Sequence, residues 1–154
     1  MVYLGSKNKI SKYITGILQN AIDENTQGFI DICCGGCNII DKIDHSNKIA
    51  VDIHPQLISL LKKVQNNIND IPDYVPEEEY NLVKNNKENY EDWYVGLVGF
   101  CASFGSKYFG GYARDKQEKR NIPNERIRNL KDQSKYLNNI KFYNCDFRNI
   151  PIIT

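Results

Sequence analysis

The chain has 154 residues, of which 41% are hydrophobic and 25% charged, with a formal net charge of +1 at pH 7. This length suits one globular domain with a core of its own. The near-neutral charge excludes a basic field over the whole molecule, no apolar run reaches the roughly 18 residues of a membrane span, and the first residues are too polar for a secretory signal.

The first half of the chain alternates predicted helices and strands. Apolar residues at helical spacing predict an amphipathic helix over residues 8–23. The runs "GFIDI" at 28–32 and "KIAVD" at 48–52 predict buried strands, with a short helix at 39–43 between them. Pro55 begins the next helix, whose apolar face comprises Leu57, Leu60, Leu61 and Val64. This order predicts an α/β fold with a parallel sheet.

The second half is mostly helical before a last strand. The loop at 69–79 leads, through Pro76 and three glutamates, into another helix. Residues 90–104 carry an apolar helical stripe, and a loop of glycine, aromatic and basic residues follows at 105–115. A further helix at 124–139 and a third strand at 140–146 complete the pattern.

This order of elements divides the chain into two parts. Residues 1–68 and 139–154 form the predicted α/β part, which would bind a cofactor. Residues 69–138 form a mostly helical insert between two strands of one sheet.

Two glycines and two acidic residues mark a candidate ligand site. Gly35 and Gly36 follow the first predicted strand, where ligands of parallel α/β sheets bind and where a bare backbone allows close approach. Asp52 ends the second strand, at the position where a carboxylate accepts the ribose hydroxyls of an adenosine-type ligand. The pattern G-x-G-x-x-G is absent, and Asp31 precedes the glycines. These features favour a cationic ligand without phosphate, such as S-adenosylmethionine.

Three cysteines lie in or next to the same turn. Cys33, Cys34 and Cys37 suggest three zinc ligands as an alternative, but no second C-x-x-C pair or H-x-x-x-H follows. We interpret them as small hydrophobic residues and expect no metal site. The odd total of five cysteines argues against a closed set of disulfides and favours a reducing cytoplasm.

Five segments, in order, resemble one enzyme family. They are "YLGSKNKI" (3–10), "DICCGGCNIIDKI" (31–43), "VDIHPQLISLLKKVQ" (51–65), "YVGLVGFCASFGSKYFGGYARD" (94–115) and "NCDF" (144–147). Together they are similar to segments of the Dam-type adenine-N6 DNA methyltransferases, the D12 class of bacteria and phages. The resemblance implies an incomplete Rossmann-like class I methyltransferase sheet of about three parallel strands. It also implies methyl transfer from S-adenosylmethionine to adenine N6 of duplex DNA, in the cytoplasm of a bacterium or phage-infected host.

The resemblance further implies which residues bind the cofactor. Tyr3 and Lys7 would contact it, Gly35 and Gly36 would cradle its methionine part, and Asp31 would orient its ammonium group. Asp52 would bind the ribose, and Asp146 and Phe147 would border the adenine ring.

Plainer interpretations stay open for several of these residues. Lys7 suits a solvated lysine at a helix start, Asp52 a helix N-cap, and Phe147 an ordinary core position. His54, beside Pro55, invites a general-base interpretation but is more typical of a structural histidine.

The insert carries the expected DNA contacts. The resemblance assigns target recognition to this region, where basic residues would contact phosphates and aromatic residues would support an unstacked base. The candidates are Lys107, Tyr108, Tyr112, Arg114, Lys116 and Arg120. A solvated loop with ordinary helix-face charges is the alternative.

The resemblance also implies an Asp-Pro-Pro-Tyr box on a further strand, which the sequence does not contain. That strand would begin about where "IPIIT" (150–154) ends. We therefore assign no catalytic residue and do not expect this chain alone to methylate DNA. Its first strand would have an unpaired apolar edge. A second chain, a homo-oligomer, and a fragment or inactivated or non-catalytic relative all remain open.

Overall fold

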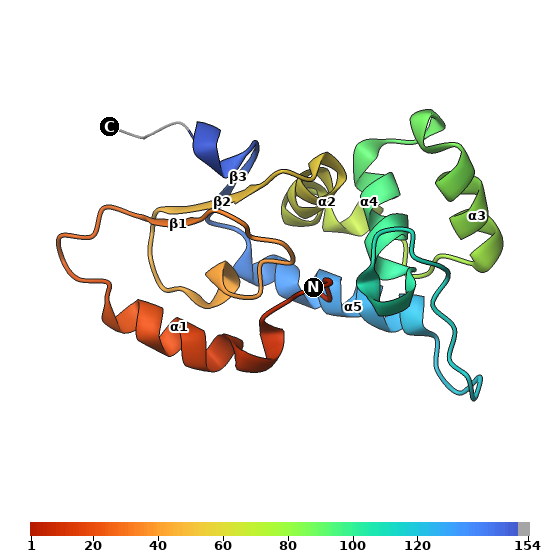
Figure 1. Ribbon diagram of the computed structural model, residues 1–154, viewed down its shortest axis with the longest axis horizontal. Coiled ribbons are helices and arrows are strands. Elements are labelled where there is room, and N and C mark those ends of the chain that lie inside the picture. Colours follow the sequence, from red (N-terminus) through yellow and green to blue (C-terminus); the bar gives the residue numbers. More distant parts are fainter. Residues whose placement is uncertain (151–154) are drawn as a thin grey trace.

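A three-stranded parallel sheet organises the cofactor-binding part predicted from the sequence. The computed structural model describes residues 1–150 (Figure 1). β1 (Phe29–Asp31), β2 (Lys48–Asp52) and β3 (Ile140–Asn144) pair in the order β1-β2-β3. Both pairings are parallel, with Asp31 opposite Ala50 and Asp52 opposite Asn144. The predicted α/β class, with a parallel sheet of about three strands, is confirmed.

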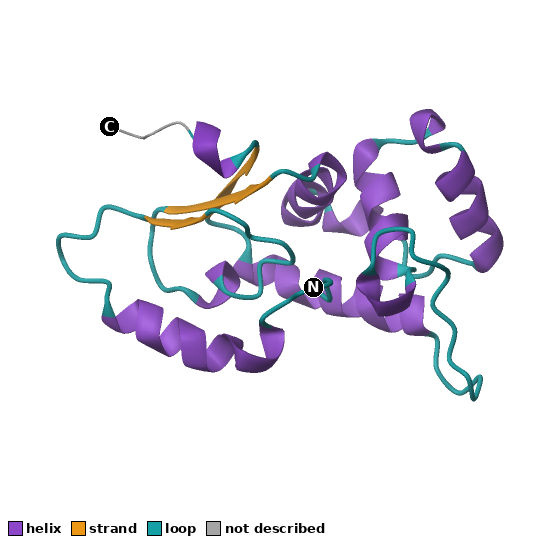
Figure 2. Ribbon diagram, in the orientation of Figure 1, coloured by secondary structure: helices purple, strands orange, loops and turns teal. Residues whose placement is uncertain are grey.

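Among residues 1–150, five α-helices accompany the sheet (Figure 2). They are α1 (Ser11–Asn20), α2 (Pro55–Asn66), α3 (Glu77–Asn85), α4 (Asp92–Cys101) and α5 (Ile122–Gln133). The predicted helix at 39–43 is instead a single 3₁₀ turn, η2 (Ile40–Lys42). α5 begins two residues earlier than predicted because Pro123 suits a first helical turn and the Asn121 side chain accepts from the Asn124 amide. None of the helices described is long and apolar enough to cross a membrane.

The core lies among α2, α4, α5 and the sheet. In Figure 1 the sheet and α1 occupy one end of the molecule, α3 and α4 the other, with α5 running between them. α2 packs closely on α4, where Gly96 brings the two helices so near that a methyl group there would collide with the Gln56 carbonyl. The predicted apolar face of α2 is confirmed, since Leu57, Leu60, Leu61 and Val64 are fully buried.

The first helix differs from the expected pattern. A 3₁₀ turn, η1 (Asn8–Ile10), precedes α1, so the predicted helix at 8–23 is shorter and irregular at its start. Within α1 the buried residues are Ser11 and Thr15, whose hydroxyl donates to the Ser11 carbonyl at 2.8 Å. The apolar stripe therefore does not face the core. The further strand, expected to begin about where "IPIIT" ends, lies outside the described residues.

Candidate cofactor site

Asp52 joins the glycine turn to the end of β2. Its Oδ2 accepts a hydrogen bond from the Gly35 amide at 3.0 Å, and its Oδ1 accepts from the His54 amide at 3.0 Å. Gly35 has φ +48°, a left-handed conformation that glycine adopts without strain. The structure thus brings the predicted glycine turn and the predicted ribose-binding carboxylate into direct contact.

Asp31 places a second carboxylate near Asp52. It ends β1, and its Oδ1 accepts from the Cys33 amide at 3.3 Å. Burial and, to a smaller extent, the charge of Asp52 raise the pKa of Asp31 above its ordinary value. Within residues 1–150 no ion pair involves either carboxylate. Two acidic groups therefore share this region without a cation from the described part of the chain.

The N-terminal segment covers both glycines. A Cβ added to Gly35 would lie 2.9 Å from Cδ1 of the Tyr3 ring, and one added to Gly36 would lie 2.8 Å from the Met1 carbonyl oxygen. Burial, followed by the charge of Asp52, raises the pKa of Tyr3. The absence of a side chain at Gly35 and at Gly36 is therefore needed for the N-terminal segment to pack on the turn. Next to it, Ile32 and Cys33 are exposed.

The end of β3 lies at the same edge of the sheet. The Asn144 side-chain amide donates to the Asp52 carbonyl at 3.0 Å. Phe147 is 53% exposed, so its alternative role as a core residue is wrong. Asp146 accepts from the Arg148 amide at 2.9 Å and pairs with the Arg148 guanidinium at 2.6 Å. Both predicted adenine-ring contacts therefore follow a strand that ends beside Asp52.

Lys7 forms no hydrogen bond with this group of residues. Its exposed ammonium donates to the Gly5 carbonyl at 3.2 Å, and none of the predicted cofactor-binding residues accepts a hydrogen bond from it. The solvated lysine considered from the sequence agrees with this placement.

Two neighbours of Asp52 were not assigned to the site from the sequence. Ile53 is 69% exposed directly after the carboxylate. The His54 ring packs edge-on against Phe100 and Tyr108, with centroids 5.1 and 4.5 Å apart, and its buried Nδ1 has no hydrogen-bond partner among the residues described. Burial lowers the pKa of His54, and the charge of Asp52 opposes this only in part. An isoleucine exposed after a buried strand gives no signal in the sequence alone.

The insert residues predicted to contact DNA fall into two groups. Arg114 forms an ion pair with Glu77, and Arg120 forms one with Glu125. With Tyr112, these two arginines line a cavity of about 370 Å³. The Tyr112 hydroxyl donates to the Val75 carbonyl at 2.8 Å, which ties this ring to the fold.

The second group differs in its exposure and partners. Lys107 and Lys116 are exposed, and neither joins an ion pair of the described residues. Tyr108 is half-buried and packs between His54 and Phe109, with ring centroids 4.5 and 4.8 Å away. Within residues 1–150, the two lysines are thus the unpaired cations of the predicted set.

A comparison with protein families decides the assignment. The model of the D12 class N6 adenine-specific DNA methyltransferases matches residues 3–151. The chain belongs to this family. A search of curated proteins gave no match. The family implies methylation of adenine in DNA, and D12 class enzymes typically use S-adenosylmethionine.

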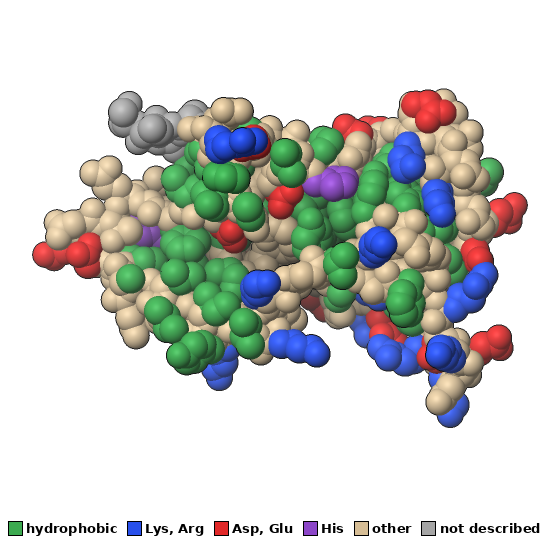
Figure 3. Space-filling model, in the orientation of Figure 1, with side chains coloured by type: hydrophobic (Ala, Val, Ile, Leu, Met, Phe, Trp, Pro, Cys, Tyr) green, Lys and Arg blue, Asp and Glu red, His purple; other side chains and the backbone are tan. Residues whose placement is uncertain are grey.

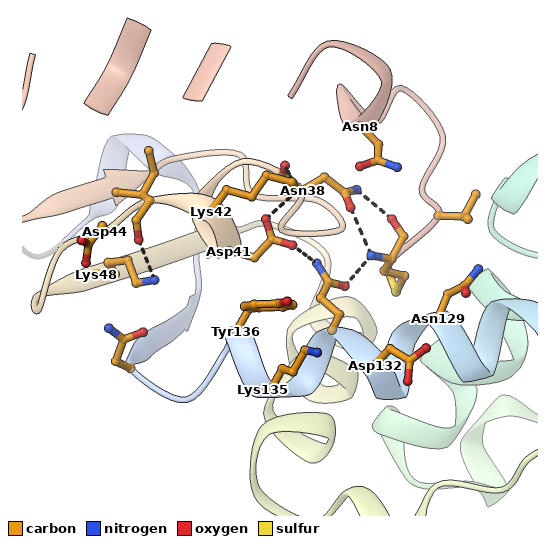
Figure 4. A pocket seen from close by; sticks show the side chains of 15 residues that line it. Asn8, Asn38, Asp41, Lys42, Asp44, Lys48, Asn129, Asp132, Lys135 and Tyr136 are labelled. Atoms are coloured by element: carbon orange, nitrogen blue, oxygen red, sulfur yellow. Dashed lines mark hydrogen bonds and ion pairs between the residues drawn. The ribbon is translucent and has the colours of Figure 1, made fainter. Parts of the chain in front are cut away.

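A cavity larger than the one beside Tyr112 lies elsewhere in this D12 class chain. Its volume is about 850 Å³, and none of the predicted cofactor-binding residues lines it (Figure 4). Lys48, at the amino end of β2, points toward it and donates to the Ile43 carbonyl at 3.0 Å. Gln133 donates to Asp41 at 2.7 Å across its wall. Because ligands of parallel sheets bind at the carboxyl ends of strands, we do not place the cofactor here.

The cysteines of the turn do not gather around a common centre. Cys33 is exposed, whereas Cys34 and Cys37 are buried. Among residues 1–150, no three His, Cys, Asp or Glu side chains are arranged to hold a metal ion.

Proposed function

We propose that this chain binds S-adenosylmethionine at the carboxyl ends of β1 and β2 and contacts duplex DNA through residues 69–138. It would act as a D12 class adenine-N6 methyltransferase, or as its N-terminal part, in the cytoplasm of a bacterial or phage-infected cell. The observation that carries this proposal is the pair of carboxylates, Asp31 and Asp52, which lie near each other without a cation of the described residues.

The chemistry of these residues suits the cofactor. When bound, S-adenosylmethionine supplies a methyl group on a sulfonium, together with an ammonium group. Asp31 would orient the ammonium, because a buried carboxylate without a counter-charge gains most from a cation. Each Asp52 oxygen accepts one backbone amide, which leaves further lone pairs for the ribose hydroxyls. Tyr3 would close one side of the site, and exposed Ile53 and Phe147 offer apolar surface to the adenine ring.

The insert would hold DNA near this site. Lys107 and Lys116 are available to neutralise phosphates, which positions a duplex without reading its sequence. Tyr108 belongs to an aromatic group with Phe100, which packs on Tyr3 at 5.5 Å between centroids. This group supports a location of the DNA-contacting loop beside the cofactor site.

The alternative is a cofactor- or DNA-binding relative without catalytic activity, or half of a split enzyme that needs a second chain. Residues 1–154 contain no Asp-Pro-Pro-Tyr box, the element that would hold the target adenine. No residue of the described chain is assigned to hold the target amine of adenine.

Calorimetry tests cofactor binding. S-adenosylmethionine and its demethylated product are titrated into the wild type, Asp31→Asn, Asp52→Asn and the control Asp132→Asn, whose side chain is exposed and lines a cavity that none of the predicted cofactor-binding residues lines. We expect binding by the wild type and control and a loss of about tenfold or more in the other two, because each removes a charged hydrogen bond. Equal affinities in all four proteins would refute the assignment.

Transfer of tritiated methyl groups to adenine-containing duplexes separates the two functions. Incorporation by the purified chain alone would support a complete enzyme. Incorporation only with a second polypeptide would support the split enzyme. Cofactor binding without incorporation under either condition would support the non-catalytic relative.

A further inference from the structure

Two different elements hold the peptide groups of the glycine turn. The Gly35 amide donates to the Asp52 carboxylate at 3.0 Å. The carbonyl of the next residue, Gly36, accepts from the Gln133 side-chain amide, also at 3.0 Å. Asp52 belongs to β2, whereas Gln133 is the last residue of α5. The two glycines are therefore fixed from separate parts of the fold.

The partners of Gln133 require an amide at this position. Its Nε2 donates to the Gly36 carbonyl and, at 2.7 Å, to the Asp41 carboxylate, while its Oε1 accepts from the Met1 nitrogen. Because a carbonyl and a carboxylate only accept hydrogen bonds, the NH2 group must face them. Dashed lines mark hydrogen bonds around the labelled Asp41 in Figure 4. A glutamate could not make these two donations, and an asparagine is one methylene shorter.

Gln133 acts on the turn and not directly on a ligand. The residue is only 6% exposed, and both its amide nitrogen and its oxygen have partners. A buried carbonyl that loses its donor is destabilised, because it lacks the water that would otherwise replace the hydrogen bond. The Gly36 peptide group would therefore leave its present position if the amide were absent.

α5 connects the turn to the insert. In Figure 1 this helix runs from the helical end of the molecule toward the sheet. Lysine and arginine side chains gather at the helical end in Figure 3. The segment with Lys116 and Arg120, both predicted from the sequence to contact DNA, leads directly into α5. One helix of 12 residues thus extends from that segment to the residue that holds Gly36.

We infer that Gln133 is a positioning residue for the methionine half of the cofactor. The inference deepens the proposed function and rests on it, since Gly36 is expected to cradle the methionine part and Asp52 to bind the ribose. Fixing the Gly36 carbonyl keeps the cradle in one shape before the ligand arrives, which lowers the cost of ordering it on binding. The methionine half of the site therefore depends on the insert, and the ribose half on β2.

Two ligands separate these halves. S-adenosylmethionine engages both, whereas methylthioadenosine keeps the adenine, the ribose and a thioether but lacks the amino acid group. Calorimetry measures both affinities for the wild type and for Gln133→Met, which keeps the length of the side chain but cannot donate. The matched control is Asn129→Met, an exposed amide one turn earlier on α5. Ile127→Val, fully buried on the same helix, controls for a general loss of stability.

We expect Gln133→Met to bind S-adenosylmethionine at least about tenfold more weakly than the wild type, and methylthioadenosine within about twofold. Both controls should bind the two ligands as the wild type does. An equal loss for both ligands, or no loss for either, would overturn the inference. So would a wild type that binds only the longer ligand, because the site would then have no separate ribose half. A wild type that binds neither ligand refutes the proposed function itself.

Hydrogen exchange tests the positioning without any ligand. In peptides that span residues 33–38, the amides of Gln133→Met should exchange at least about threefold faster than those of the wild type, because the turn opens more readily without its bond to α5. Asn129→Met should exchange at the wild-type rate. An unchanged rate in Gln133→Met would show that this side chain does not hold the turn, whatever the cofactor affinities are.

Discussion

The Gly35 amide donates to the Asp52 carboxylate at 3.0 Å, so the turn after β1 and the end of β2 form one unit. We expect Asp52→Ala to lower the free energy of unfolding by about 1–3 kcal/mol, because the buried Gly35 amide loses its acceptor. Urea unfolding measures this, with Asp132→Ala as an exposed control expected to change stability by less than about 0.5 kcal/mol. Equal stabilities for the two variants would show that the bond does not matter.

Gly36 and Gly16 should respond to alanine in opposite directions. A Cβ at Gly36 would lie 2.8 Å from the Met1 carbonyl oxygen and 3.2 Å from the Tyr3 Cβ, whereas one at Gly16 meets nothing within 4 Å. We expect Gly36→Ala to destabilise the protein by about 1–3 kcal/mol through overpacking. Gly16→Ala should stabilise it by about 0.5–1 kcal/mol, since alanine favours a helix interior. Thermal unfolding of both variants provides the comparison, and a stable Gly36→Ala would contradict the tight N-terminal packing.

Asp31 should make stability depend on pH. Its pKa is raised in the folded protein, so the folded state holds this proton more readily than the unfolded state. The resulting contribution favours folding in acid and is lost as pH rises from the ordinary aspartate range, about 3.9, through the raised pKa. Asp31→Asn does not titrate, so it should be more stable than the wild type at pH 7, and this gain should shrink as pH falls toward 4.

The same substitution should weaken cofactor binding. A charged hydrogen bond contributes about 1.5–3 kcal/mol, so Asp31→Asn should bind S-adenosylmethionine roughly ten- to a hundredfold more weakly at pH 7. Urea unfolding and calorimetry from pH 4 to 8 measure both effects. A variant that is less stable and binds normally would contradict a ligand-directed role for this carboxylate.

The two exposed lysines of the insert should govern the salt dependence of DNA binding. Replacing both Lys107 and Lys116 by alanine should reduce the slope of log K against log salt by about 0.9 for each phosphate that is no longer neutralised. The decrease in affinity should be similar for duplexes of different sequence, because phosphate contacts carry no sequence information. Fluorescence anisotropy between about 50 and 200 mM salt measures the slopes. Lys62→Ala, exposed on α2, is the control, and equal slopes would argue against insert contacts.

Local burial made much of the fold predictable. β2 matches its predicted bounds because all five of its residues are buried and the middle three, Ile49, Ala50 and Val51, form an apolar run. The face of α2 was equally clear, since a regular stripe packs on one core. Asp52 followed from its position after such a strand.

The remaining features depend on distant contacts. The periodicity of α1 predicted a helix but not that Ser11 and Thr15 would be its buried residues, while Tyr13 and Ile17 are exposed. The glycines predicted a close approach, and the approaching groups among the described residues are Met1 and Tyr3. The pairing of Arg114 with Glu77 joins positions 37 residues apart, which composition cannot indicate.

The contacts of Gly36 set an order for assembly during synthesis. The Gln133 side chain donates to the Gly36 carbonyl at 3.0 Å across a separation of 97 residues. A ribosome releases the turn long before it releases α5. This hydrogen bond can therefore form only after α5 has been synthesised, and its long sequence separation is of the kind that slows folding.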